Sequence, residues 1–141
     1  MQTFLPYKSI QKSMKCLDYK RLGKQRVEAM QILKALNDVN YGWRNHPCVK
    51  MWSGYEDALK AYMNASIVEW IDRGYNNTML IVDHKEDYKN PSWLGDSRVH
   101  DSHKSNLLRK EPQFYKKYNW KVPDTIEYYW AGHGKNEKEI R

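Results

Sequence analysis

The chain has 141 residues and a mass of 17.0 kDa, and its 24 Lys and Arg against 17 Asp and Glu give a net charge of +7. This length predicts one domain, and the absence of any run of about 18 uncharged apolar residues excludes a membrane-spanning helix. The first residues lack the pattern of a secretory signal, and two cysteines fit a reducing compartment better than a disulfide framework.

Helical patterns dominate the sequence, and the first long one predicts a helix from Leu17 or Asp18 to about Asn37. Asp18 can act as its N-cap. Gly23 lies inside it at a cost of about 1 kcal/mol relative to Ala, which indicates a close approach by another backbone or a ligand. The residues that recur at helical spacing should face the core: Leu22, Ala29, Met30, Leu33 and Leu36.

A second helical region should begin at Pro47 and reach about Arg73 in one or two pieces, with Gly74 directly after its end. Residues 76–93 predict either a short helix or irregular structure. A third helix is expected from Arg98 to about Lys110, and a short helical piece should follow from Pro112 to about Tyr118. Asp96 or Ser97 would cap the third helix.

These patterns predict an all-α fold, a compact single-domain bundle of about three main helices with irregular connections. The domain should span residues 1–132. Residues 133–141 are charged and lack a pattern that would bury them, so they are expected to form a flexible tail.

Three stretches carry side chains suited to chemistry, and the first is one face of the helix that begins near Asp18. Arg21, Lys24, Gln25 and Glu28 share that face because they are spaced by three, four and seven residues, and Arg26 flanks it. One carboxylate among several cations would suit an anionic substrate and one acid or base. The plain alternative is a solvated face with an ion pair between Lys24 and Glu28.

The second stretch is the loop that contains Trp43, Arg44, Asn45 and His46. Arg, Asn and His can donate hydrogen bonds to phosphates and base edges, and Trp can stack on a base. Alternatively, this is a structural loop before a helix, with Asn45 or His46 as the cap and Trp43 in the core.

The third stretch is the helix predicted from Arg98. His100 and His103 are three residues apart, a spacing that could bind a metal with His46 or a carboxylate to complete the shell, but the chain has no CxxC or HExxH pattern and we predict no metal. Polar groups near a helix N-terminus suit phosphate better, and a surface helix of mixed charge is the alternative. The candidate residues here are Arg98, His100, His103, Ser105, Asn106, Arg109 and Lys110.

The aromatic composition is compatible with a nucleic-acid partner. The chain has 6 Trp and 11 Tyr but only 2 Phe. Trp and Tyr combine a stacking ring with a polar edge, and a basic domain rich in them is typical of nucleic-acid binders. Small domains also place these rings in their cores, so composition alone leaves both interpretations open.

Three blocks resemble the pyrimidine-dimer DNA glycosylase family, the endonuclease V type of phages and bacteria. They are Met1-Gln2-Thr3-Phe4-Leu5-Pro6 with Leu17-Asp18 leading to Val27-Glu28-Ala29-Met30, then Gly42-Trp43-Arg44-Asn45-His46-Pro47, and then Arg73-Gly74-Tyr75. Together they cover roughly the first half of the chain in the family's order. The sequence departs from the family pattern at Gln2, where a small residue is usual, and at Val27, where an arginine often precedes the glutamate.

The resemblance implies an all-α fold whose N-terminus packs against the first long helix. It implies a glycosylase with AP-lyase activity on a damaged or modified pyrimidine-type base, in which the α-amino group attacks C1′ of the sugar and forms an imine. By motif, Met1 would supply the amine and Glu28 would be the acid or base. The residues expected to hold DNA are Arg21, Lys24, Arg26, Trp43, Arg44, Asn45, His46 and the candidates of the helix from Arg98.

The same resemblance predicts a monomer without cofactor, metal or membrane contact that binds DNA, with double-stranded DNA as the expected form. It also predicts a cytoplasmic protein of phage, viral or bacterial origin. Two other functions stay open on the residues. One is a non-catalytic DNA- or RNA-binding protein of the same fold, and the other is a metal-dependent nuclease built on His46, His100 and His103.

Overall fold

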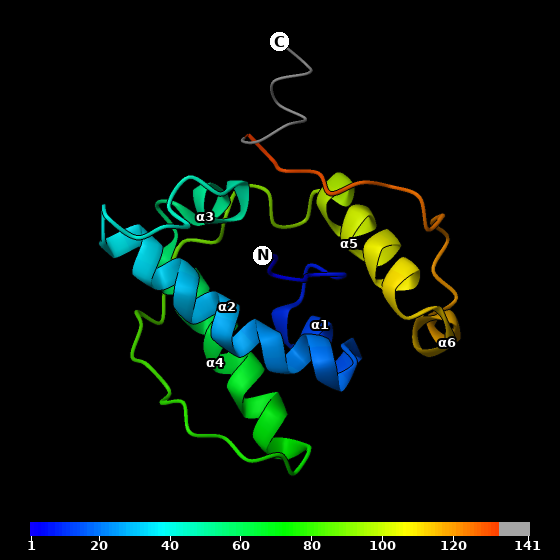
Figure 1. The fold of residues 1–141 in the computed structure, drawn as a ribbon, viewed down its shortest axis with the longest axis horizontal. Coiled ribbons are helices and arrows are strands. Elements are labelled where there is room, and N and C mark those ends of the chain that lie inside the picture. Colours follow the sequence, from blue (N-terminus) through cyan, green and yellow to red (C-terminus); the bar gives the residue numbers. More distant parts are fainter. Residues whose placement is uncertain (133–141) are drawn as a thin grey trace.

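The computed structural model describes residues 1–132, which contain α-helices, one 3-10 helix and no strand, so the all-α prediction is confirmed (Figure 1). The flexible tail predicted for residues 133–141 lies outside the described residues. No helix within 1–132 is long and apolar enough to cross a membrane. The elements are α1 (Ile10–Cys16), α2 (Tyr19–Asn37), α3 (Pro47–Trp52), α4 (Glu56–Asp72), α5 (Ser97–Lys110), α6 (Pro112–Tyr115) and η1 (Lys116–Tyr118).

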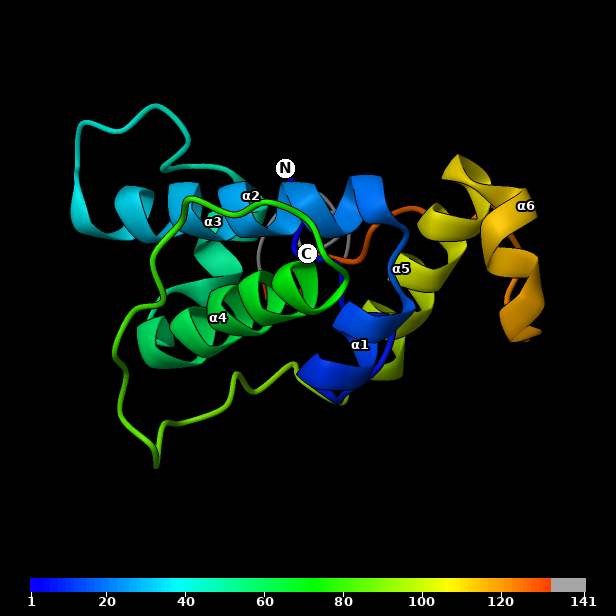
Figure 2. The same ribbon diagram turned by 90° about the horizontal axis from the view of Figure 1, so that it is seen from below.

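The two longest helices, α2 and α4, pack against each other (Figure 2). Met30, Leu33 and Leu36, which we expected in the core, are only partly buried. The buried stripe of α2 is rotated slightly from the expected one and includes a polar residue, and its members are Leu22, Gln25, Ala29, Ile32 and Ala35. The hydrophobic pattern alone could not find a stripe in which an amide side chain is buried.

Gly23 allows this close packing. A Cβ atom at Gly23 would lie 3.0 Å from the indole ring of Trp70 on α4. The close approach predicted at Gly23 therefore exists, but an aromatic side chain makes it rather than a backbone or a ligand. Gly74 follows the end of α4 with φ +89°, a conformation that favours glycine, so its prediction is confirmed.

The sequence prediction missed α1. This helix has only seven residues, with Ser9 as the N-cap whose side chain accepts a hydrogen bond from the Lys12 amide at 3.1 Å. Helices this short are marginal in isolation. Ile10 and Met14 are buried in the core, so tertiary packing stabilises α1 and its own periodicity is too short to reveal it.

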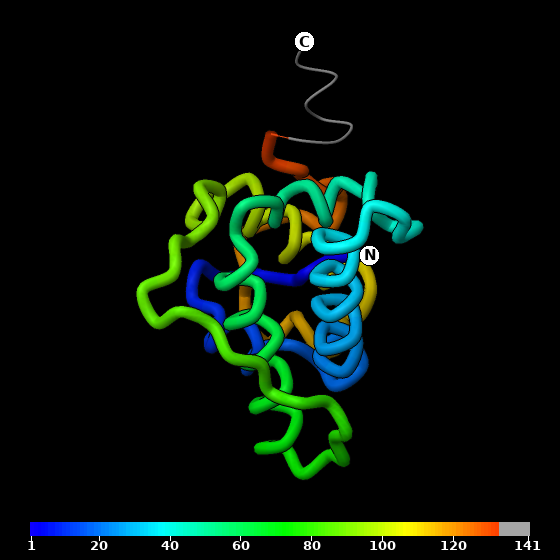
Figure 3. The backbone as a smooth tube through the Cα atoms, turned by 90° about the vertical axis from the view of Figure 1, so that its left-hand side faces the viewer, coloured from blue at the N-terminus to red at the C-terminus, as the bar shows by residue number. Residues whose placement is uncertain are grey.

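The N-terminal segment, residues 1–6, has no helix and passes through the middle of the molecule between α2 and α5 (Figures 1 and 3). Met1 is half-buried, and Gln2 to Pro6 are buried. An extended segment cannot pair its own peptide groups, so a buried one needs hydrogen-bond partners from its surroundings. The hydrogen bonds to these partners fix the position of the N-terminal segment and therefore of the amino terminus.

Candidate active site

The amino terminus lies beside Glu28 of α2. The amide of Gln2 donates a hydrogen bond to Glu28 Oε2 at 3.4 Å. The positive charge of the amino terminus acts on the pKa of Glu28, His46 and Cys48, so all three side chains lie within electrostatic range of it. The fold therefore brings together an amine, a carboxylate and an imidazole from three separate parts of the chain.

Burial shapes the electrostatics of this cluster. It raises the pKa of Glu28 above its usual value, against the opposing effects of the amino terminus, the Gln2 amide and Lys24. Burial, followed by the charge of the amino terminus, lowers the pKa of His46. A carboxyl group with a raised pKa beside an amine suits a group that takes up and returns a proton.

His46 also has a structural role. Its Nδ1 accepts a hydrogen bond from the Cys48 amide at 3.0 Å and caps α3, as the structural alternative for this loop predicted. The same alternative placed Trp43 in the core, but its exposed fraction is 49%. The His46 ring packs edge-on against Trp130, with 5.6 Å between ring centroids. Arg44 and Asn45 are exposed.

The predicted face of α2 separates into groups with different surroundings. Lys24 is exposed next to Glu28, whereas Gln25 is buried and its Oε1 accepts hydrogen bonds from the Phe4 amide at 2.8 Å and the Tyr62 hydroxyl at 2.7 Å. Arg26 lies over the Trp70 ring at 4.3 Å and donates to Asn77 Oδ1 at 2.7 Å. Of these cations, Lys24 is the one beside Glu28 that faces solvent.

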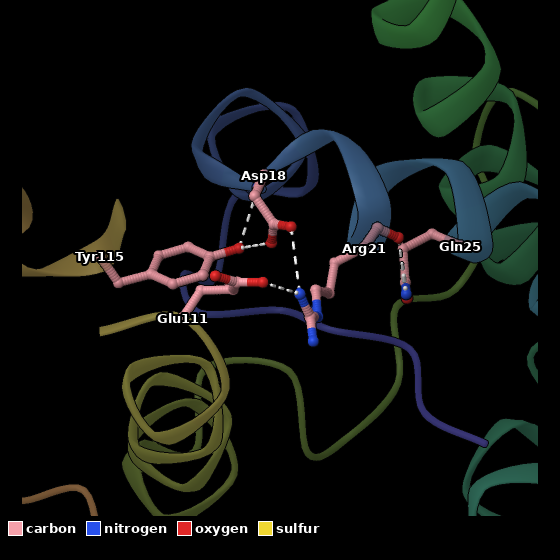
Figure 4. A network of polar contacts seen from close by, with 5 residues as sticks. All are labelled: Asp18, Arg21, Gln25, Glu111 and Tyr115. Carbon is pink, nitrogen blue, oxygen red and sulfur yellow. Dashed lines mark hydrogen bonds and ion pairs between the residues drawn. The ribbon is translucent and has the colours of Figure 1, made fainter. Parts of the chain in front are cut away.

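Arg21 is held between two carboxylates (Figure 4). Its Nη1 lies 3.2 Å from Asp18 and 3.0 Å from Glu111, which comes from the junction of α5 and α6. The Tyr115 hydroxyl accepts from the Asp18 amide at 2.9 Å and donates to the Asp18 carboxylate. Asp18 is the N-cap of α2 as predicted, but its side chain makes this network instead of a cap hydrogen bond.

The uncharged polar candidates of α5 (His100, His103, Ser105 and Asn106) are buried, and the structure gives them partners other than the nucleic acid we expected. His100 and His103 bind the backbone of Leu5. Ser105 Oγ accepts from the Ile126 amide at 2.8 Å, and Asn106 Nδ2 donates to the Ile126 carbonyl at 3.0 Å. The helix therefore holds an irregular segment on each side, and this is the packing reason for its Ser, His and Asn residues.

A stability prediction follows from the burial of His103. Burial, followed by the charge of His100, lowers the pKa of His103 to about 3, whereas its unperturbed value is 6.5. Below pH 6.5 the unfolded chain binds a proton that the folded chain excludes. We expect the contribution of His103 to the free energy of unfolding to keep its full value above pH 6.5. Below pH 6.5 this contribution should fall by up to about 1.4 kcal/mol per pH unit. Urea unfolding at pH 7.5, 6 and 5 measures this slope.

The variant His103→Asn provides the comparison, because its side chain cannot take up a proton. Its unfolding free energy should depend less on pH over the same range. Burial also lowers the pKa of His100, so part of the slope remains in the variant. An identical slope in the two proteins would contradict the assignment to His103.

A groove of about 630 Å³ separates α5 from residues 126–130. Arg98 lies over the Tyr129 ring at 4.5 Å and pairs with Asp96, and Arg109 binds Asn106 and the Asp124 carbonyl. Tyr128 and Trp130 line the groove, and Trp130 connects it to the amine cluster because its ring packs on His46. Burial raises the pKa of Tyr128 to about 12, against the charge of Arg109.

Sequence reasoning missed several residues of this site. Gln2 and Thr3 shape the segment that leads to the amine, and Tyr128 and Trp130 line the groove beside it. The aromatic run at 128–130 was a usable sign of a stacking surface. Its position next to His46 and Glu28 depends on a return of the chain along α5 that no local pattern predicts.

The structure does not assemble the metal site of the alternative nuclease function within residues 1–132. That range contains no group of three His, Cys, Asp or Glu side chains able to hold a metal ion. Both ring nitrogens of His100 and the Nδ1 atom of His103 are bonded to backbone groups. His46, His100 and His103 are therefore not arranged as a shared set of ligands there.

Comparison with known proteins identifies a family for this chain. The family model for pyrimidine dimer DNA glycosylase matches residues 1–83, which include the amino terminus, Glu28 and His46 and extend beyond the end of α4. Neither a curated protein nor a solved structure matches the chain significantly. The match covers more than half of the chain, and the chain therefore belongs to the pyrimidine dimer DNA glycosylase family, whose substrate is DNA.

Proposed function

We propose that this protein is a DNA glycosylase with AP-lyase activity that excises a damaged or modified pyrimidine-type base. The α-amino group of Met1 is the nucleophile and Glu28 is the acid and base. The observation that carries the proposal is the position of the amino terminus beside Glu28, whose Oε2 already accepts the Gln2 amide. An α-amino group suits this role because a neutral amine is a nucleophile that forms an imine with a sugar carbon.

The reaction begins when the amine lone pair forms a bond to C1′ of the nucleotide. The bond from C1′ to the base breaks, and the base leaves with that electron pair and takes up a proton from water. Glu28 accepts a proton from the new C1′ amine and returns it to the ring oxygen, which opens the sugar and gives the imine. Loss of a C2′ proton then expels the 3′ phosphate by β-elimination and cuts the strand.

Exposed cations on α2, α5 and the loop before α3 provide the surface for the phosphates. Lys24, Arg44 and Lys110 are exposed, and Arg98 and Arg109 line the groove along α5. Trp43 and Asn45 stand in the exposed loop before His46, where a ring can stack and an amide can bind a base edge. We assign Arg21, Arg26, His100, His103, Ser105 and Asn106 to the scaffold, because each binds protein groups and is buried or partly buried, whereas Arg98 and Arg109 are exposed.

Borohydride trapping tests this function. The purified protein is incubated with duplex DNA that carries one abasic site, and borohydride reduces any imine to a stable amine. We expect a covalent adduct whose linkage maps by peptide mass spectrometry to the amino group of Met1. An adduct on Lys24, the neighbouring side-chain amine, would contradict the assigned nucleophile. Tight, salt-dependent binding without any adduct would instead favour the non-catalytic DNA-binding function.

A further inference from the structure

Four side chains from three helices bind the peptide groups of Phe4 and Leu5. The Phe4 amide donates to Gln25 of α2 at 2.8 Å, and its carbonyl accepts from the Tyr62 hydroxyl of α4 at 2.9 Å. The Leu5 amide donates to His103 Nδ1 at 2.9 Å, and the Leu5 carbonyl lies 2.6 Å from His100 Nδ1. Both hydrogen-bond partners of the Leu5 peptide groups are therefore side chains of α5.

The two histidines bind Leu5 in opposite tautomers. The Gly95 amide donates to His100 Nε2 at 2.8 Å, so in the neutral ring Nδ1 carries the hydrogen and donates it to the Leu5 carbonyl. His103 Nδ1 accepts from the Leu5 amide, so its hydrogen is on Nε2. Each neutral ring therefore pairs with one polar group of Leu5. A protonated histidine donates from both ring nitrogens, so it could not accept the Leu5 amide as His103 does.

This attachment lies on the path to the reacting amine. Gln2, whose amide binds Glu28, is three residues before Leu5, and every residue between them is buried. The segment cannot shift along its axis without breaking the bonds at Leu5. The two histidines lie on α5, beyond the residues 1–83 that match the family model, so this part of the chain supplies an attachment that the matched part lacks.

We propose that His100 and His103 are positioning residues that hold the α-amino group of Met1 against Glu28 through the backbone of Leu5. The inference rests on the proposed function, in which that amine attacks the sugar. Neither ring touches the substrate. Their contribution is to fix the geometry of attack, and an error of about 1 Å in such a geometry can lower a rate by up to about 100-fold.

The test compares two substitutions of His103. In His103→Asn the amide oxygen can take the place of Nδ1 and accept the Leu5 amide, whereas His103→Leu fills the space without an acceptor. His103 Nε2 has no hydrogen-bond partner, so neither substitution removes a second bond. The first measurement is the single-turnover rate of imine trapping at saturating abasic DNA, and the second is hydrogen exchange of the amides of residues 3–5.

We expect His103→Leu to trap about tenfold more slowly than the unaltered protein, with unchanged DNA affinity, and its Leu5 amide to exchange at least about tenfold faster. His103→Asn should restore both quantities to within about threefold. The matched control is the pair His84→Leu and His84→Asn, since the His84 ring packs on Tyr88 in the loop before α5. Both controls should trap and exchange at the rates of the unaltered protein.

Two results would overturn the proposal. One is faster exchange at Leu5 in His103→Leu with an unchanged trapping rate, because the amine would then not depend on this attachment. The other is unchanged exchange at Leu5, because His103 would then not hold the segment. If the unaltered protein itself forms no adduct, the proposed function fails, and the exchange measurement still decides whether His103 anchors the N-terminal segment.

Discussion

Two extra residues placed before Met1 will abolish imine formation. The extension moves the free amine away from Glu28 and leaves an amide at the position of attack, and an amide is not a nucleophile. We expect the single-turnover trapping rate on abasic DNA to fall on the order of 10³-fold or more, as it does when other enzymes lose their nucleophile. Gly-Ser is a suitable extension, and the residual rate is measured by borohydride trapping.

The control for this experiment carries the same Gly-Ser extension after Arg141. It should trap at the rate of the unaltered protein, and both extended proteins should keep their DNA affinity and its dependence on salt. Met1 is half-buried, so the thermal unfolding of both proteins is measured as a check on folding. Rapid trapping by the N-terminally extended protein would show that another amine performs the reaction.

Substitution of Glu28 by Gln will slow the reaction by about 10²- to 10⁴-fold, the usual contribution of a general acid or base. The amide keeps the shape of the side chain and can still accept from the Gln2 amide, but it cannot take a proton from the amine. Burial raises the pKa of Glu28, so the charged form is disfavoured by desolvation, and the variant should be at least as stable as the unaltered protein above that pKa.

The pH profile provides a second measurement for Glu28. The trapping rate of the unaltered protein should fall toward acid as Glu28 takes up a proton, with an apparent pKa above the usual 4.5 of this group. In Glu28→Gln the part of this fall that is due to protonation of Glu28 should be absent. Glu86→Gln, which makes the same change at an exposed position, is the control. A variant at Glu28 with full activity would contradict its role as the acid and base.

Local signals in the sequence predicted several features correctly. Asp96 caps α5 and accepts from the Arg98 amide at 2.9 Å, and Gly74 adopts the conformation expected after α4. Caps and positive φ angles depend on a few neighbouring residues, so a sequence pattern is sufficient to find them. The short helix α1 and the buried position of Gln25 depend on distant partners, and the same kind of reasoning missed both.

The residues predicted for the site also fall into those that the sequence identified and those that the tertiary structure reassigned. The resemblance to the family pointed to Met1, Glu28 and His46, and in the structure the charge of the amino terminus acts on both of the other two side chains. Spacing also suggested His100 and His103 as ligands for nucleic acid, because polar residues on a helix are usually exposed. The structure buries them instead, since the extended N-terminal segment brings unpaired peptide groups into the interior and these groups need partners.

The sequence by itself determined that the chain is helical, the approximate bounds of α2 and α5, the end of α4, and which family the chain belongs to, because these properties rest on local periodicity, caps and motifs. The tertiary structure alone decided which polar residues meet the amine and which support it. Glu28 and His103 are both polar residues on helices, and nothing local distinguishes them. They differ in the part of the N-terminal segment that each faces: Glu28 faces its reactive end, and His103 binds its backbone.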